Sequence, residues 1–85
     1  MLPEPRVREW TVRMRLEETG RVVTAIAELI DDQGGQLAVK GVFDTDFADR
    51  EPVNARRELA VARALRRLAD QLISSAGQKL SIPDR

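Results

Sequence analysis

The chain has 85 residues, 14 basic and 14 acidic side chains, and a formal net charge of zero. This length supports one small hydrophobic core, and the balanced charge excludes a protein that coats nucleic acid through bulk positive charge. Cysteine and histidine are absent, which excludes disulfides, zinc sites of the usual kind and catalysis through either residue. No leader or membrane-spanning pattern is recognisable, so we expect a cytoplasmic protein with no membrane partner.

The first predicted strand begins after a proline-containing segment. Residues 1–8 include two prolines and are expected to form an irregular lead-in. From Trp10 to Glu17 apolar and polar side chains alternate, which is typical of a strand with one buried face. Because Trp10 is in phase with Val12 and Met14, we expect its indole in the core rather than stacked on a nucleic acid base.

Two further strands are predicted from residues 21–31 and 36–43. A turn at Glu18 to Gly20 separates the first two, and Gly34-Gly35 supplies the left-handed conformations of a second tight turn. The strand at 21–31 is apolar on both faces. One face carries Val23, Ala25, Ala27 and Leu29, and the other carries Val22, Ile26 and Ile30.

A long helix follows a polar, acidic loop at residues 44–54. Apolar residues recur every three or four positions from about Asn54 to Ala76, which indicates an amphipathic helix. Asn54 is the expected N-cap and Gly77 the expected stop, which leaves residues 77–85 as a C-terminal tail. The predicted fold is α+β: a three-stranded antiparallel meander and one helix packed on one face, forming a single domain over residues 9–76.

The outward face of such a sheet suggests an assembly. One helix covers one face, and we expect it to cover the face carrying Trp10, Val12, Met14 and Leu16. The other face would then expose an apolar patch, which usually marks an interface. The patch consists of Val22, Ile26, Ile30 and Val42. We therefore predict a homodimer through this patch, with Arg13 and Arg15 facing acidic groups such as Glu28 of the partner copy. The alternative is that the sheet twists, or the terminal segments fold over, to cover the patch.

Several short stretches together resemble a known family. They are Glu9-Trp10-Thr11-Val12, the spaced Thr24, Ala27 and Leu29, Gly41, Ala48-Asp49-Arg50, and the helical run from Glu58 to Leu68. In order and spacing, they resemble a small actinobacterial family of dsRBD-like proteins with no assigned function. The resemblance implies a β-β-β-α fold and dimers. Some members of that family are linked to hypoxic or dormant growth and have been compared with ribosome hibernation factors, so the resemblance implies a role of that kind. Unlike double-stranded RNA-binding domains, the chain lacks a helix before the sheet.

Charge is divided unevenly along the chain. Residues 17–51 carry a net −6 and the helix at 54–76 a net +3. All basic residues of the helix are arginines, whose planar guanidinium groups suit phosphate. They are Arg56, Arg57, Arg63, Arg66 and Arg67. At 100° per residue, positions 56, 63 and 67 share one side, whereas 57 and 66 lie elsewhere. Two interpretations stay open: a solvated helix face, and a surface that binds phosphate.

No catalytic or metal site is predicted. Asp44, Asp46 and Asp49 lack the remaining ligands of a calcium loop and are expected to shape a turn. The paired carboxylates flank exposed turns, and no nucleophile and base can be paired. We therefore predict a non-enzymatic accessory protein without a cofactor or small-molecule substrate. Its helix arginines would bind structured RNA or the ribosome. The alternative is a protein-interaction or regulatory module with no nucleic acid partner.

Overall fold

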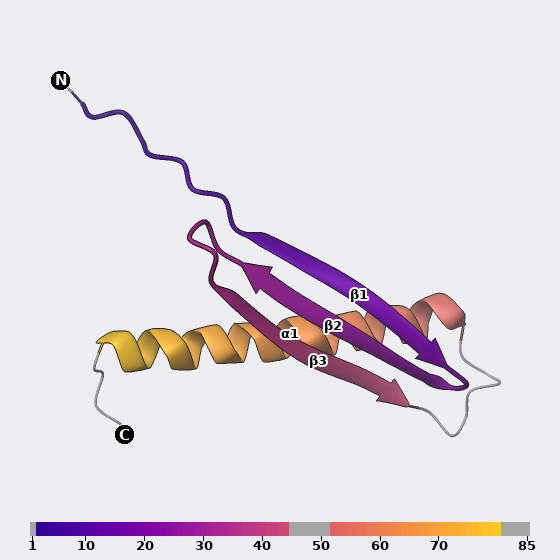
Figure 1. The fold of residues 1–85 in the computed structure, drawn as a ribbon. Helices are drawn as coiled ribbons and strands as arrows, with labels where there is room; N and C mark the ends of the chain where they lie inside the picture. The colour runs from indigo at the N-terminus through magenta and orange to yellow at the C-terminus, as the bar shows by residue number, and fades with distance from the viewer. Residues whose placement is uncertain (1, 45–51, 81–85) are drawn as a thin grey trace.

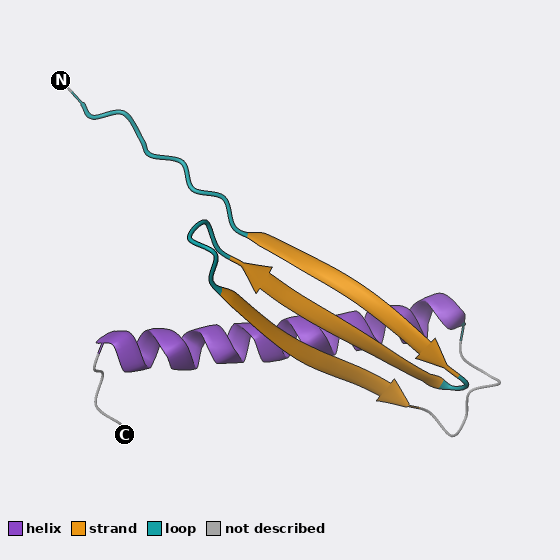
Figure 2. Cartoon of the chain, in the orientation of Figure 1, coloured by secondary structure: helices purple, strands orange, loops and turns teal. Residues whose placement is uncertain are grey.

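The computed structural model describes residues 2–44 and 52–80. Three strands, β1 (Thr11–Thr19), β2 (Val22–Ile30) and β3 (Gln36–Asp44), precede one helix, α1 (Val53–Leu80). The strands form one antiparallel sheet in the order β1-β2-β3, and α1 crosses one face of it (Figure 1). Residues before β1 lead away from the sheet as an extended segment (Figure 2). The predicted α+β meander with one long helix is confirmed.

The β1–β2 hairpin is tighter than expected. Its closing pair is Thr19 and Val22, so Glu18 and Thr19 belong to β1, and only Gly20 and Arg21 form the turn. Gly20 has φ 59°, a left-handed conformation that a two-residue hairpin turn requires and that glycine adopts without strain. The register then continues without interruption to Thr11 opposite Ile30. Val12, Met14 and Leu16 consequently share a face with the alternate β2 residues from Val23 to Leu29.

The turn between β2 and β3 is organised by Asp31. Its Oδ1 accepts hydrogen bonds from the backbone N–H groups of Gln33 at 2.8 Å and Gly35 at 2.7 Å. The backbone N–H of Asp31 donates to the carbonyl oxygen of Gly35 at 3.0 Å. Gly34 has φ 85° and is left-handed as predicted, whereas Gly35 is not. An aspartate that accepts bonds from the backbone just ahead of it is a common turn device, and here it fixes the start of β3.

The helix begins at Val53 and runs for 28 residues to Leu80. It therefore passes through Gly77, and the prediction of a stop at that residue is wrong. Asn54 lies inside the first turn rather than at the cap, and its Oδ1 accepts a bond from Arg57 at 3.4 Å. A single glycine costs about 1 kcal/mol in a helix interior, which the rest of this long helix offsets. No helix in the described part of the chain combines the length and apolar character of a membrane span.

The core is thin because its central residues are small. Ala25, Ala27, Ala60 and Ala64 are fully buried, and the larger Val23, Leu29 and Leu68 surround them. At the crossing, Gly41 of β3 lies directly against α1. A Cβ atom at this position would lie 2.5 Å from the carbonyl oxygen of Ala60 and 2.8 Å from the Cα of Ala64. Glycine is therefore required here to allow the close approach of two backbones.

The helix covers the sheet unevenly. It packs on β3 and β2 and hardly touches β1. Of the strand-one residues expected in the core, Met14 is half-buried, whereas Val12 and Leu16 are 47% and 40% exposed. Trp10 precedes β1 and is 56% exposed, so its predicted place in the core is wrong. The helix lies on the expected face of the sheet, but it is displaced toward β3 and leaves β1 largely uncovered.

Candidate anion-binding site

Two helix arginines reach across the free edge of β3. Arg63 Nη1 donates to the carbonyl oxygen of Val42 at 2.8 Å, and Arg67 Nη1 donates to that of Lys40 at 3.2 Å. The guanidinium of Arg63 also lies 5.1 Å from the centroid of the Phe43 ring, within the range of a cation–π contact. Each contact uses only part of a guanidinium with five N–H donors, so both side chains are held in place with donors left over.

Arg66 joins these two residues around a concavity of about 440 Å³, which we call the basic concavity. It is lined by Val42, Arg63, Arg66, Arg67 and Asp70. Position 66 lies on a different side of the helix from positions 63 and 67, yet the Arg66 side chain lines the same concavity. The angular estimate locates the Cβ atoms, whereas long arginine side chains converge beyond them. A shallow depression beside it shares Arg67 and Asp70 and adds Lys40 from β3.

The other two helix arginines, Arg56 and Arg57, lie near the start of α1 and do not line the basic concavity. Arg57 is bonded through Nε to Glu18 Oε2, and its Nη2 donates to Glu18 Oε1 at 3.2 Å, which makes a two-pronged ion pair. The hydrogen bond from Arg57 lowers the pKa of Glu18, and the nearby charges of Arg57 and Arg56 lower it further. Reciprocally, that hydrogen bond raises the pKa of Arg57. The Arg56 Nε is buried without a hydrogen-bond partner. The ion pair between Arg57 and Glu18 links the start of α1 to the end of β1.

The predicted dimer patch faces away from the helix. Val22, Ile26 and Ile30 are half-buried among their cross-strand neighbours, and Val42 is 43% exposed. Arg13 pairs with Glu28 of the same chain at 3.6 Å, directly across the β1–β2 ladder, and Arg15 pairs with Glu17 at 3.7 Å. Both arginines thus have acidic partners within the chain. Whether a second copy covers this patch stays a prediction.

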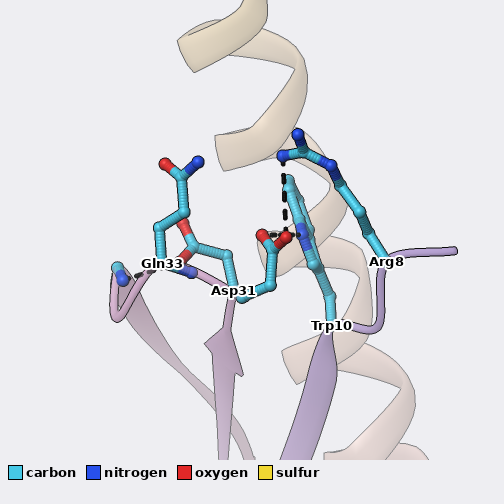
Figure 3. Close-up of polar contacts among 6 residues, drawn as sticks. Arg8, Trp10, Asp31 and Gln33 are labelled. Atoms are coloured by element: carbon cyan, nitrogen blue, oxygen red, sulfur yellow. Dashed lines mark hydrogen bonds and ion pairs between the residues drawn. The ribbon is translucent and has the colours of Figure 1, made fainter. Parts of the chain in front are cut away.

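A polar cluster holds the exposed Trp10 in position (Figure 3). Its indole N–H donates to Asp32 Oδ1 at 3.1 Å, and Arg8 pairs with Asp32 Oδ2 at 3.5 Å. One side of the indole lines a cleft of about 420 Å³ between the β2–β3 turn and the second half of α1, where Ser75 and Lys79 are found. The bond to Asp32 fixes the orientation of the exposed indole.

Some sequence predictions cannot be placed, and one feature was missed. Asp46 and Asp49 lie outside the described residues, and in residues 2–44 and 52–80 no group of acidic side chains is arranged to hold a metal ion. The sequence analysis missed the link between Arg63 or Arg67 and the carbonyl groups of β3. The one available signal was the spacing of these arginines, four residues apart on a helix following a strand.

Comparisons with known proteins agree with the fold. A family model described as Rv2632c-like matches residues 8–83. A solved structure, described as the crystal structure of Rv2632c, superimposes with a TM-score of 0.76 at 29% sequence identity. The match covers 98% of this chain and 100% of that one. None of the curated proteins searched matches this chain.

Proposed function

The chain belongs to the Rv2632c-like family, and we propose that it is a non-catalytic accessory protein that binds the phosphate backbone of structured RNA, free or within the ribosome. The family's description names no activity. The observation that carries the proposal is the basic concavity, where Arg63, Arg66 and Arg67 face one space beside the edge of β3. Asp70 in the same concavity offsets one of the three charges.

Preorganisation favours this surface over an ordinary solvated arginine face. Arg63 and Arg67 are fixed by the carbonyl oxygens of Val42 and Lys40, so a phosphate that binds there immobilises little that is still free. Guanidinium groups offer paired donors that match phosphate oxygens. Lys40 continues the positive charge along the strand. Contacts of this kind read no base sequence, so we expect recognition of shape and charge rather than of sequence.

The decisive experiment is a titration of purified ribosomes and of duplex RNA over a series of salt concentrations. Arg66 is the residue to replace first, because it lines the concavity while Arg63 and Arg67 also bond to the sheet. For Arg66→Ala we expect weaker binding and a salt slope smaller by about one phosphate contact. Arg13→Ala removes the same charge from the opposite face and serves as the control, with little effect expected. Equal losses for both variants, or no binding at low salt, would disprove the proposal.

A second candidate function rests on exposed apolar side chains. Two exposed apolar residues, Val12 and Leu16, lie on β1, and the exposed Trp10 directly precedes it. Exposed apolar surfaces are typical of protein contacts. Like the interaction module predicted from the sequence, this candidate has no nucleic acid partner, but it uses these residues instead of the outward sheet face. It predicts that Arg66→Ala has no effect on any binding and that Trp10→Ala abolishes capture of the partner. The RNA titration therefore separates the two functions directly.

A further inference from the structure

Three concavities follow one another along β3 and α1. The basic concavity shares Arg67 and Asp70 with the shallow depression beside it. That depression in turn shares Gln71 with the cleft beside Trp10, which we call the tryptophan cleft. Lys79 in the last turn of α1 also lines this cleft, about 18 Å along the helix from Arg67 at the helical rise of about 1.5 Å per residue. The shared residues join the three concavities into one path that leads from the arginines to the indole.

The two ends of this path differ in chemistry. The basic concavity presents three arginines and one acid, and guanidinium groups match the paired oxygens of phosphate. The tryptophan cleft combines the indole and leucine side chains with two glutamine amides and the hydroxyl of Ser75. Among its lining residues one acid, Asp31, balances one cation, Lys79, so the cleft has no net charge and gives an anion no advantage. One end therefore suits phosphate, and the other suits an uncharged planar ring.

Trp10 has the properties of a stacking platform. It is 56% exposed, and its indole N–H donates to Asp32, which also pairs with Arg8 (Figure 3). These contacts hold the ring in one orientation, so a base that stacks on it immobilises little that is still free. Gln71 and Ser75 form no hydrogen bond with another described side chain. Their amide and hydroxyl groups can therefore pair with the donors and acceptors along the edge of a base.

We propose that the tryptophan cleft binds an unpaired base at a single-stranded end of structured RNA, stacked on Trp10, while the phosphates of the same strand follow Lys40 and the basic concavity. This inference rests on the proposed function, because the arginines hold the strand that delivers the base. It identifies the preferred RNA as a duplex with a short single-stranded overhang instead of a blunt duplex. Every base has a π-face, so stacking selects unpaired nucleotides without reading their sequence.

The single tryptophan makes the cleft directly observable. The chain contains no tyrosine, so its intrinsic fluorescence reports on Trp10. The full chain is titrated at low salt with a blunt RNA duplex and with the same duplex extended by a short single-stranded overhang. We expect the overhang to tighten binding about tenfold and to quench the fluorescence, whereas the blunt duplex should quench it little. An overhang of abasic nucleotides supplies the same phosphates without bases and should give little of the gain and no quenching.

Replacement of the indole separates stacking from charge. Trp10→Ala should lose the gain from the overhang and bind the blunt duplex as the parent chain does. Trp10→Phe keeps an aromatic ring and should retain most of the gain, which a merely structural role of the indole would not predict. Ile73→Ala removes an apolar side chain that is 70% exposed on α1 and does not line the cleft, so it is the matched control with no expected effect. Circular dichroism checks that each variant is folded.

The outcomes separate this inference from the proposed function. If both duplexes bind equally and Arg66→Ala weakens both, the cleft takes no base and the inference is overturned, while the proposed function stands. A gain that survives Trp10→Ala would also overturn it, and would leave the indole to the protein contact of the second candidate function. Absence of binding to either RNA at low salt would overturn both proposals.

Discussion

The two edges of the sheet are treated differently by the rest of the molecule. At β3, the helix lies directly against Gly41, and Arg63 and Arg67 bond to the carbonyl groups that the strand would otherwise leave free. At β1, the helix makes few contacts, and its main link is the ion pair between Arg57 and Glu18 at one end. In the described part of the chain, helix side chains bond to the edge strand β3, whereas the helix makes few contacts with the edge strand β1.

This difference follows from the small residues at the crossing. Ala60, Ala64 and Gly41 are small enough to let the helix approach β3 and β2 closely, and in that position the helix leaves β1 largely uncovered. The stability of the chain should therefore depend strongly on the closed side of the sheet and weakly on β1. Four experiments examine that contrast, beginning with the largest effect.

Gly41→Ala should be the most damaging change. The added Cβ would meet the backbone of Ala60 and Ala64, which can yield only if the helix moves away from the sheet. We expect the free energy of unfolding to fall by about 3 kcal/mol, at the upper end for overpacking, as measured by urea denaturation. Gly77→Ala is the matched control. Nothing lies within 4 Å of its added Cβ, and greater helix propensity should stabilise the protein by up to about 1 kcal/mol. Equal effects at both glycines would contradict the close crossing.

A pair of leucine truncations on α1 compares the packed and open sides. Leu68 is 4% exposed and belongs to the core, whereas Leu65 is 45% exposed. Leu68→Ala should reduce the unfolding free energy by about 2 to 3 kcal/mol, and Leu65→Ala by less than about 1 kcal/mol. Thermal unfolding of both variants at one protein concentration gives the comparison. If Leu65→Ala costs as much as Leu68→Ala, the side of α1 that carries Leu65 is packed against something.

Removal of the two arginines that bond to β3 should expose the backbone carbonyl groups at this edge of the sheet. The double variant Arg63→Ala, Arg67→Ala frees the carbonyl groups of Val42 and Lys40, at a cost of about 1 kcal/mol or more in unfolding free energy. An exposed edge also promotes pairing between molecules, so we expect light scattering that increases with protein concentration. Arg13→Ala, which loses an ion pair on the outward face, should show no such increase. Unchanged scattering in the double variant would mean that the arginines do not protect this edge.

The ion pair at the end of β1 should give the smallest effect, visible through its pH dependence. Arg57 lowers the pKa of Glu18 below the ordinary value of 4.5, so the stabilisation is fully present above that value. It is lost as the pH falls through the lowered pKa of the folded state. Glu18→Gln should therefore unfold more easily than the parent chain near neutral pH, and the two should converge in acid. A difference that persists unchanged in acid would assign the effect to packing instead of charge.

Much of the fold could be predicted from the sequence. Period-two alternation located β1, and the two glycine-containing turns set the meander in the correct order. The division of β2 into a buried set from Val23 to Leu29 and an outward set from Val22 to Ile30 also agrees with the structure. These features are local, because strand alternation and turn chemistry depend on neighbouring residues.

The errors arise where distant elements meet. The position of α1 over β2 and β3 left Trp10 exposed, and no periodicity within β1 carries that information. The helix continued through Gly77 because one unfavourable residue does not outweigh a long helix. Among the candidate site residues, the arginines were identified by type and position. Their grouping depends on side-chain reach and on the edge of β3, so the sequence did not indicate that Arg66 shares a concavity with Arg63 and Arg67, or that Lys40 lies beside it.

The alanine-rich crossing also affects how the protein responds to denaturant and heat. Alanine buries far less apolar surface than leucine or phenylalanine, and where helix and sheet are closest the core has two alanines, Ala60 and Ala64, and one glycine, Gly41. Both the heat capacity change and the denaturant sensitivity of unfolding scale with the surface newly exposed. A single chain of this kind should therefore unfold over a broad interval, with a shallow stability curve in temperature.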